Sequence, residues 1–168
     1  MLFRSAARER GRELWAQVGP FPLGMEFTLR HPYPLEAFIA WRPAIEAANE
    51  AEYCRVLRDA SFRSGLKKEA SIPGVPNRFS SKTWEHLTIM EATRPEHRAL
   101  VGRTIAELAR ESARDPFDVF LDFGLDGELD AMFDCRLFNT DENEVRKLLR
   151  HRHAAVALSD AGAHLSFL

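Results

Sequence analysis

The sequence has little cysteine, and its two cysteines are far apart. Cys54 and Cys135 lie in different halves of the 168-residue chain, and neither belongs to a Cys-x-x-Cys pair. Without such spacing, the sequence indicates neither a disulfide framework nor a zinc knuckle. We interpret both cysteines as reduced core thiols in a cytoplasmic protein.

An excess of charge of either sign is also missing. The chain has 23 Lys and Arg residues against 25 Asp and Glu residues, a formal net charge of −2 and a pI near 6.3. Nucleic acids and anionic membranes are bound by clustered Lys and Arg that displace counterions. We therefore expect no nucleic acid and no membrane among the partners.

Long apolar runs are absent as well. No run could cross a bilayer, and residues 1–10 become charged before the apolar core of a signal peptide could form. We expect neither export nor membrane insertion. What is present is an ordinary composition, with 45% hydrophobic and 29% charged residues, which fits one globular domain with a buried core.

The chain begins with the pattern of half an α/β unit. Residues 4–13 have the composition of a helix, and residues 14–18 alternate as a strand does. Residues 20–42 are rich in proline and aromatic side chains, which excludes a regular element and favours an ordered loop. His31 in this loop is a candidate substrate contact, although a lone loop histidine is more often a surface residue.

Helices are predicted through the middle of the chain. Residues 42–70 have the apolar spacing of two amphipathic helices, with breaks at Asn49 and Asp59. Thr104 and Glu107 have the spacing of a capping box and predict another helix start.

One further helix and two strands are predicted. Asp115 is expected to cap the helix that ends at Gly124 or Gly127. The strands are expected at residues 84–90 and 131–137.

Predictions are also made for two single residues, His86 and Thr140. His86, within the first of these strands, is interpreted as a structural residue. Thr140 is expected to cap a further helix that carries Val145, Leu148 and Leu149.

The chain closes on a short apolar run, residues 154–158, which predicts a strand buried on both faces. It ends in the turn Ser159-Asp160-Ala161-Gly162. In parallel sheets, a carboxylate at the carboxyl end of a strand projects into the crevice where ligands bind, so Asp160 is the first candidate. The simpler alternative is that Asp160 caps the next element and that His164 is a surface residue.

A His-x-His pair, His151 and His153, has the spacing of a metal site, but it precedes the closing strand. The seven residues from His153 to Asp160 would span about 23 Å when extended, which predicts that the two groups lie at opposite ends of the strand. The face that carries the histidine pair is the one that contributes to stability in a barrel. We therefore do not assign a metal to this pair.

Several of these segments resemble the amidohydrolase superfamily, and within it most closely the N-acyl-D-amino-acid deacylase (D-aminoacylase) group. The resemblance is carried by residues 156–164 (VALSDAGAH), 138–151 (FNTDENEVRKLLRH), 55–63 (RVLRDASFR), 102–109 (GRTIAELA) and 115–118 (DPFD). Residues 156–164 resemble the last barrel strand of that family. Residues 138–151 resemble the helix that precedes this strand.

The resemblance implies an α/β fold: a partial (β/α) TIM-barrel segment with a mainly helical insertion between its last two barrel strands. It implies one partial domain over residues 1–168. Within that domain we expect a helix and a barrel strand in residues 1–19, a loop and helical insertion region in residues 20–130, and a closing strand-helix-strand in residues 131–168.

The resemblance also implies a chemistry. Members of the family use zinc to activate a water that attacks an amide carbonyl, and the closing-strand Asp takes a proton from that water and passes it to the leaving amine. Asp160 matches that catalytic, metal-facing carboxylate, and His164 and Ser159 are expected to contact substrate. The implied cofactor is zinc, and the implied partner is a small-molecule N-acyl amino acid. The mid-barrel histidines of the family have no counterpart here.

Two functions therefore remain open. A full barrel needs about 250 residues, and this sequence matches only the carboxyl-terminal part of one. The chain is either a fragment of a metal-dependent hydrolase of N-acyl-D-amino acids or a related linear amide, or a non-catalytic, truncated barrel remnant that needs the missing strands or a partner chain. The non-catalytic hypothesis predicts self-association through open strand edges.

Overall fold

The fold is mixed α/β. The computed structural model describes residues 7, 9–12, 14–72 and 83–157. Their elements are, in chain order, β1 (Ala16–Val18), β2 (Leu23–Phe27), η1 (Ile39–Trp41), α2 (Arg42–Ile45), α3 (Glu50–Arg58), α4 (Ala60–Ala70), η2 (Thr83–Glu85), β3 (Leu87–Glu91), η3 (Pro95–Leu100), α5 (Ile105–Ser112), α6 (Pro116–Asp126), β4 (Met132–Phe138), α7 (Glu142–Leu149) and β5 (Ala154–Val156).

The chain divides into two compact units. Residues 1–23 and 137–168 form one, called here the terminal unit, and residues 24–136 form the other, called the central unit. Among the described residues no closed barrel is formed, because the strands belong to a two-stranded sheet and a three-stranded sheet.

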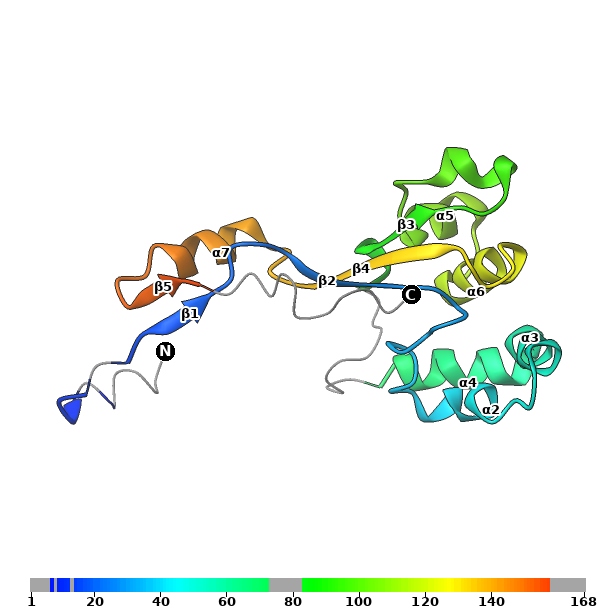
Figure 1. Cartoon of the computed structure of the whole chain (residues 1–168), viewed down its shortest axis with the longest axis horizontal. Helices are drawn as coiled ribbons and strands as arrows, with labels where there is room; N and C mark the ends of the chain where they lie inside the picture. The colour runs from blue at the N-terminus through cyan, green and yellow to red at the C-terminus, as the bar shows by residue number, and fades with distance from the viewer. Residues whose placement is uncertain (1–6, 8, 13, 73–82, 158–168) are drawn as a thin grey trace. The chain divides into compact units, whose positions relative to one another are not determined.

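The terminal unit contains the parallel pair of β1 and β5, with α7 directly before β5 in the chain (Figure 1). The predicted helix over this region is confirmed, but its cap is not the expected Thr140. Asp141 begins α7, since its carboxylate accepts hydrogen bonds from the backbone N–H groups of Asn143 and Glu144 at 2.9 and 3.1 Å. A carboxylate at this position also favours the positive end of the helix dipole.

The terminal unit buries little apolar surface of its own. Val18 and Val145 are its buried hydrophobic side chains among the residues that the structure describes. The closing strand was expected to be buried on both faces, and for the described part of β5 this is wrong, because Val156 is 65% exposed. The physical reason is that β5 has β1 as its neighbouring strand in a sheet of only two strands.

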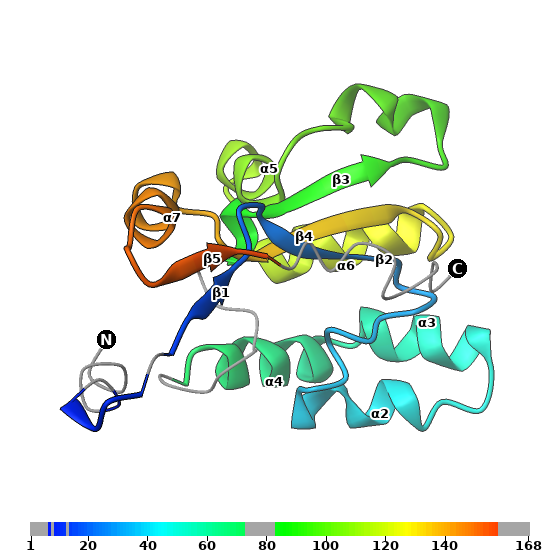
Figure 2. The ribbon, with the colours of Figure 1, turned by 60° about the vertical axis from the view of Figure 1, so that its left-hand side comes forward.

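The central unit contains a three-stranded sheet in the order β2, β4, β3 (Figure 2). β3 and β4 are antiparallel, and Ile89 lies opposite Phe133. The prediction that residues 20–42 lack regular structure is wrong at β2. Gly24 explains the pairing, because a Cβ there would lie 2.9 Å from both Asp134 Oδ1 and the Cys135 carbonyl. Only glycine allows the backbones to approach this closely.

Helix α6 forms the core against this sheet. Asp115 caps it as predicted, accepting from the Phe117 N–H at 2.9 Å, and of the two predicted ends Gly127 is the one observed. The Phe120 ring of α6 lies 6.1 Å from that of Phe27 in β2 and 4.8 Å from that of Phe133 in β4. This aromatic cluster fixes α6 to the sheet.

The predicted breaks at Asn49 and Asp59 are confirmed, and each residue is also a helix cap. The Asn49 side chain accepts from the Glu52 N–H at 2.9 Å to begin α3, and Asp59 accepts from the Phe62 N–H at 2.8 Å to begin α4. The capping box at α5 is also present, with both of its reciprocal hydrogen bonds. Each cap supplies an acceptor to an N–H group that the helix itself cannot satisfy.

The remaining predictions concern His86, the two cysteines and membrane-spanning helices. His86 lies between η2 and β3 rather than within a strand, so the predicted strand begins later than expected. Both cysteines are free, Cys135 is buried as expected of a core thiol, and Cys54 is only half-buried. Burial raises the pKa of the Cys135 thiol to about 12. No helix of the described residues has the length and apolarity that a membrane crossing requires.

Candidate functional site

The predicted site residues Ser159, Asp160 and His164 lie outside the described residues, which end at Ala157. The structure describes the strand that leads to them. Ala16 pairs with Ala154 in register, and the Ala157 N–H donates to the Val18 carbonyl at 3.3 Å. Because the strands are parallel, the carboxyl ends of both, at Val18 and Val156, lie at the same end of this two-stranded sheet.

The histidine pair lies at the other edge, at the amino end of β5. The His153 carbonyl accepts from the N–H of Ala16, the first residue of β1, at 3.0 Å, and its ring lies 5.6 Å from that of Trp15. The His153 N–H donates to His151 Nδ1 at 3.2 Å. The prediction that this pair precedes the closing strand is confirmed. The described residues hold no cluster of three or more His, Cys, Asp or Glu side chains that could bind a metal ion.

The candidate loop histidine, His31, is exposed and its N–H donates to Thr28 Oγ1 at 3.2 Å. Its neighbour Arg30 is more strongly held, with ion pairs of 2.6 Å to both Glu50 and Asp130. The hydrogen bond with Arg30 holds the pKa of Asp130 below its ordinary value. The loop is therefore fixed by Arg30, and no described contact gives His31 a chemical role.

A second candidate site lies within the central unit, over α6. It is a hollow of about 890 Å³, called here the α6 hollow, whose size is in the range of small-molecule sites. Its charged lining residues are Arg58, Arg63, Arg94, His97, Glu111, Arg114, Asp122 and Asp126.

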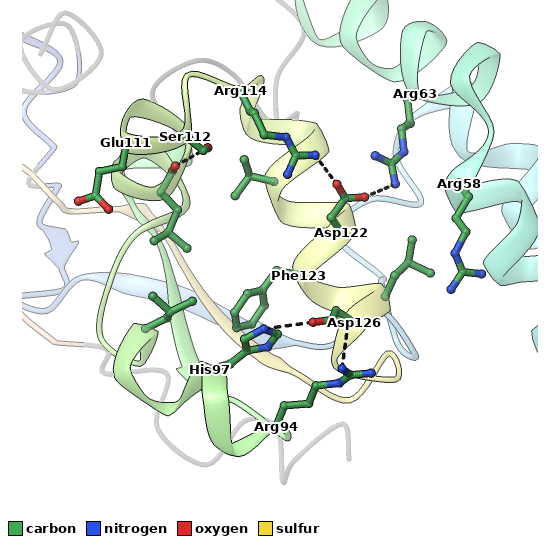
Figure 3. A pocket seen from close by; sticks show the side chains of 14 residues that line it. Arg58, Arg63, Arg94, His97, Glu111, Ser112, Arg114, Asp122, Phe123 and Asp126 are labelled. Atoms are coloured by element: carbon green, nitrogen blue, oxygen red, sulfur yellow. Dashed lines mark hydrogen bonds and ion pairs between the residues drawn. The ribbon is translucent and has the colours of Figure 1, made fainter.

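Two carboxylates one helical turn apart organise this hollow (Figure 3). Asp122 accepts from Arg63 at 2.7 Å and also pairs with Arg114. Asp126 lies 3.2 Å from Arg94.

His97 lies beside Asp126 in the lining of the hollow (Figure 3). His97 Nε2 lies 3.1 Å from Asp126, and the imidazole stacks on the Phe123 ring at 4.9 Å. This site was not predicted from the sequence, because its residues come from separate stretches of the chain. The available signal was the spacing of Asp118, Asp122 and Asp126, which puts three acids on one face of α6.

The electrostatics of Asp122 follow from two opposed effects. Burial acts to raise the pKa of this carboxyl, but the hydrogen bonds from Arg63 and Arg114 outweigh it, so that its pKa lies below the ordinary value. Asp122 is therefore ionised at neutral pH. Arg63 is held further by Asp118 and by the Leu57 carbonyl, so each of its three guanidinium nitrogens has a hydrogen-bond partner in the protein.

Comparison with known proteins gives distant relatives. No protein-family profile matches the chain, and no solved structure matches it. The chain is similar to proteins described as uncharacterized from Mycobacterium bovis and from the CDC 1551 and H37Rv strains of Mycobacterium tuberculosis, at 27% identity over 131 residues. The match covers 77% of this chain and 21% of each relative, so the chain spans about a fifth of the length of these curated relatives.

Proposed function

We propose that the chain supplies the closing strands of a metal-dependent amidohydrolase that acts on N-acyl-D-amino acids or a related linear amide. The observation that carries the proposal is the parallel pairing of β1 with β5, in the register Ala16 to Ala154. Parallel neighbours cannot be joined by a hairpin and need a crossover, which in (β/α) barrels is a helix. Here α7 comes directly before β5 and contributes to the terminal unit.

The chain order of the central unit supports the same proposal. Residues 24–136 separate β1 from the segment that returns to β5, and they contain α3, α4, α5 and α6. A compact, mainly helical unit placed between two neighbouring parallel strands is what the resemblance implies for the insertion. The observed limits differ from the expected 20–130 because β2 and β4 pair within one sheet.

In this proposal Asp160 follows the carboxyl end of β5 and acts as the proton-transfer group. It accepts a proton from the attacking water as the new C–O bond forms at the amide carbonyl. It then gives that proton to the leaving nitrogen as the C–N bond breaks. Ser159 and His164 are proposed to contact substrate beside it.

Zinc is the metal that the resemblance implies, and the described residues do not fit it. A catalytic zinc needs about three protein ligands with one open position. His151 and His153 lie at the amino end of β5 and have no third ligand within a described cluster. The proposal therefore assigns the described residues a framework role and routes no step through the metal.

Release of free amine from N-acetyl-D-methionine in the presence of zinc tests the proposal, with the L-enantiomer as the stereochemical control. Asp160→Asn should abolish release, because an amide cannot accept the proton. Glu142→Gln, on the exposed first turn of α7, should leave it unchanged. If folded wild-type chain releases no amine and binds no stoichiometric zinc, the proposal fails for this polypeptide.

One observation favours the alternative, a non-catalytic barrel piece that needs a partner chain. The terminal unit exposes large apolar side chains, at Leu14, Trp15, Phe21, Phe138, Leu148 and Val156. A two-stranded sheet is marginal in water unless its apolar face is covered. Light scattering should then show self-association that Val156→Lys weakens and that Met90→Lys, an exposed site in the central unit, does not. A monodisperse wild-type monomer contradicts this alternative.

A further inference from the structure

One charged side chain that lines the α6 hollow has no oppositely charged partner among the described residues. Four arginines and three carboxylates line the hollow, and two acids just outside it, Asp118 and Glu96, also pair with Arg63 and Arg94. Asp122 and Asp126 are each held between two basic groups, and Glu111 pairs with Arg103. None of the three carboxylates pairs with Arg58.

Arg58 is that side chain. It belongs to the last residue of α3, is exposed, and makes no hydrogen bond or ion pair with any residue that the structure describes. Arg94 and Arg114 make their ion pairs through a single guanidinium nitrogen each, Nη1 and Nη2 respectively. Both therefore keep N–H donors for a further acceptor, since a guanidinium has five.

Apart from Ser112, the rest of the hollow's lining is apolar. The Phe123 ring lies among the charged groups, with His97 stacked against one side of it (Figure 3). The aliphatic side chains that complete the lining are those of Leu100, Leu108, Val119 and Leu125. A site with an apolar wall and a few convergent polar groups is the usual form of a small-molecule site.

We propose that the α6 hollow binds a small monoanionic amphiphile, a carboxylate with an aliphatic body, and that Arg58 is its principal anion-binding group. The carboxylate is expected to accept paired hydrogen bonds from the guanidinium, for which the planar fork is well suited. The aliphatic body lies along Phe123 and its apolar neighbours. The hollow belongs wholly to the central unit, so this inference goes beyond the proposed hydrolase and does not involve Asp160.

Net charge and polarity favour a carboxylate over a phosphate. A dianion would meet only one arginine, Arg58, that lacks a carboxylate partner among the described residues, whereas a monoanion matches that single positive charge. Inorganic phosphate also has no apolar part to remove Leu108 and Phe123 from water. The class of ligand follows from both features together.

Calorimetric titration of the full chain at neutral pH with sodium octanoate tests the proposal, with octan-1-ol and inorganic phosphate as the two partial probes. Octanoate should bind saturably, at least tenfold more tightly than either partial probe. Arg58→Gln should weaken octanoate binding at least fivefold. Arg98→Gln, on η3 but outside the hollow's lining, is the matched control and should leave it unchanged.

A further variant separates the apolar contribution. Leu108→Gln should weaken octanoate while leaving the weak phosphate binding as it was, because only the aliphatic body contacts this wall. Absence of saturable octanoate binding overturns the proposal, as does equal weakening by Arg58→Gln and Arg98→Gln. Phosphate binding as tight as octanoate also overturns it. Since only binding is measured, these results are independent of whether the chain hydrolyses amides.

Discussion

The side chain of Leu29 lies directly over Gly124 of α6. A Cβ atom at Gly124 would be 2.3 Å from Leu29 Cδ1 and 2.7 Å from its Cγ, closer than two non-bonded carbon atoms can pack. Leu29 is fully buried, and its carbonyl accepts a 2.7 Å hydrogen bond from the Tyr53 hydroxyl. The segment after β2 is therefore held between α6 and α3.

Gly124→Ala should destabilise the central unit by about 1–3 kcal/mol, because the added methyl group forces Leu29 out of a tightly packed position. Gly65→Ala is the matched control within α4. Its Cβ would meet only the Ala40 Cβ, at 3.6 Å. The higher helix propensity of alanine should therefore stabilise the central unit by about 0.5–1 kcal/mol. Urea unfolding followed by circular dichroism measures both, and equal effects of the two substitutions would contradict the packing argument.

Glu69 holds the start of the η1 and α2 region. Its carboxylate accepts from the Ile39 N–H at 2.9 Å and from the Ala40 N–H at 2.7 Å, although it is only 9% exposed. Glu69→Ala should cost about 2–3 kcal/mol in unfolding free energy, since two N–H groups lose a charged acceptor. Glu36→Ala, at an exposed position, should change it by less than about 0.5 kcal/mol. A loss at position 69 no larger than this would exclude the capping role.

Asp122 should make the free energy of unfolding fall as the pH is lowered into the acid range. Its pKa is lower in the folded chain than the value of about 3.9 in the unfolded chain, so its stabilisation is complete above that value and is lost as the pH falls through the folded pKa. Because Asp122 is partly exposed, Asp122→Asn should cost no more than about 1 kcal/mol at pH 7. Urea titrations should show that the difference in unfolding free energy between wild type and Asp122→Asn is smaller at pH 3 than at pH 7. A larger difference at pH 3 would contradict this role of Asp122.

The central unit should fold without the terminal unit. A chain of residues 22–138, which keeps β2 and β4 whole, contains the aromatic cluster of Phe27, Phe120 and Phe133. We expect one cooperative thermal transition with dispersed amide resonances. A gradual transition would show that the aromatic cluster is insufficient by itself.

Local signals were predictable from sequence, and long-range pairing was not. Asn49 and Asp59 were identified correctly as breaks between helices and Asp115 as a helix cap, because each side chain bonds an N–H group only two or three residues away. β2 was missed because its partner is β4, more than a hundred residues later, and because Gly24 resembles a loop residue until its close neighbour Asp134 is known.

The candidate sites follow the same rule. The position of the histidine pair before β5 could be predicted from strand length alone, because a strand advances by a fixed rise per residue. The α6 hollow could not, since Arg58, Arg94 and Arg114 meet only after three separate segments have packed around α6. Arg58 has no distinguishing sequence context, and only its lack of a partner among the described residues sets it apart.

The close approach of Gly24 to β4 has a consequence for how the central unit is connected. A Cβ at Gly24 would lie 3.3 Å from the Arg136 Cα, so the chain enters and leaves this unit at neighbouring points. The folded central unit therefore holds its first and last residues close together, as a short loop would. The chain entropy lost in bringing residues 23 and 137 together is then part of the folding of the central unit. Such a unit can be exchanged as a cassette, and we expect a short glycine-rich bridge from residue 23 to residue 137 to replace it without lengthening the connection.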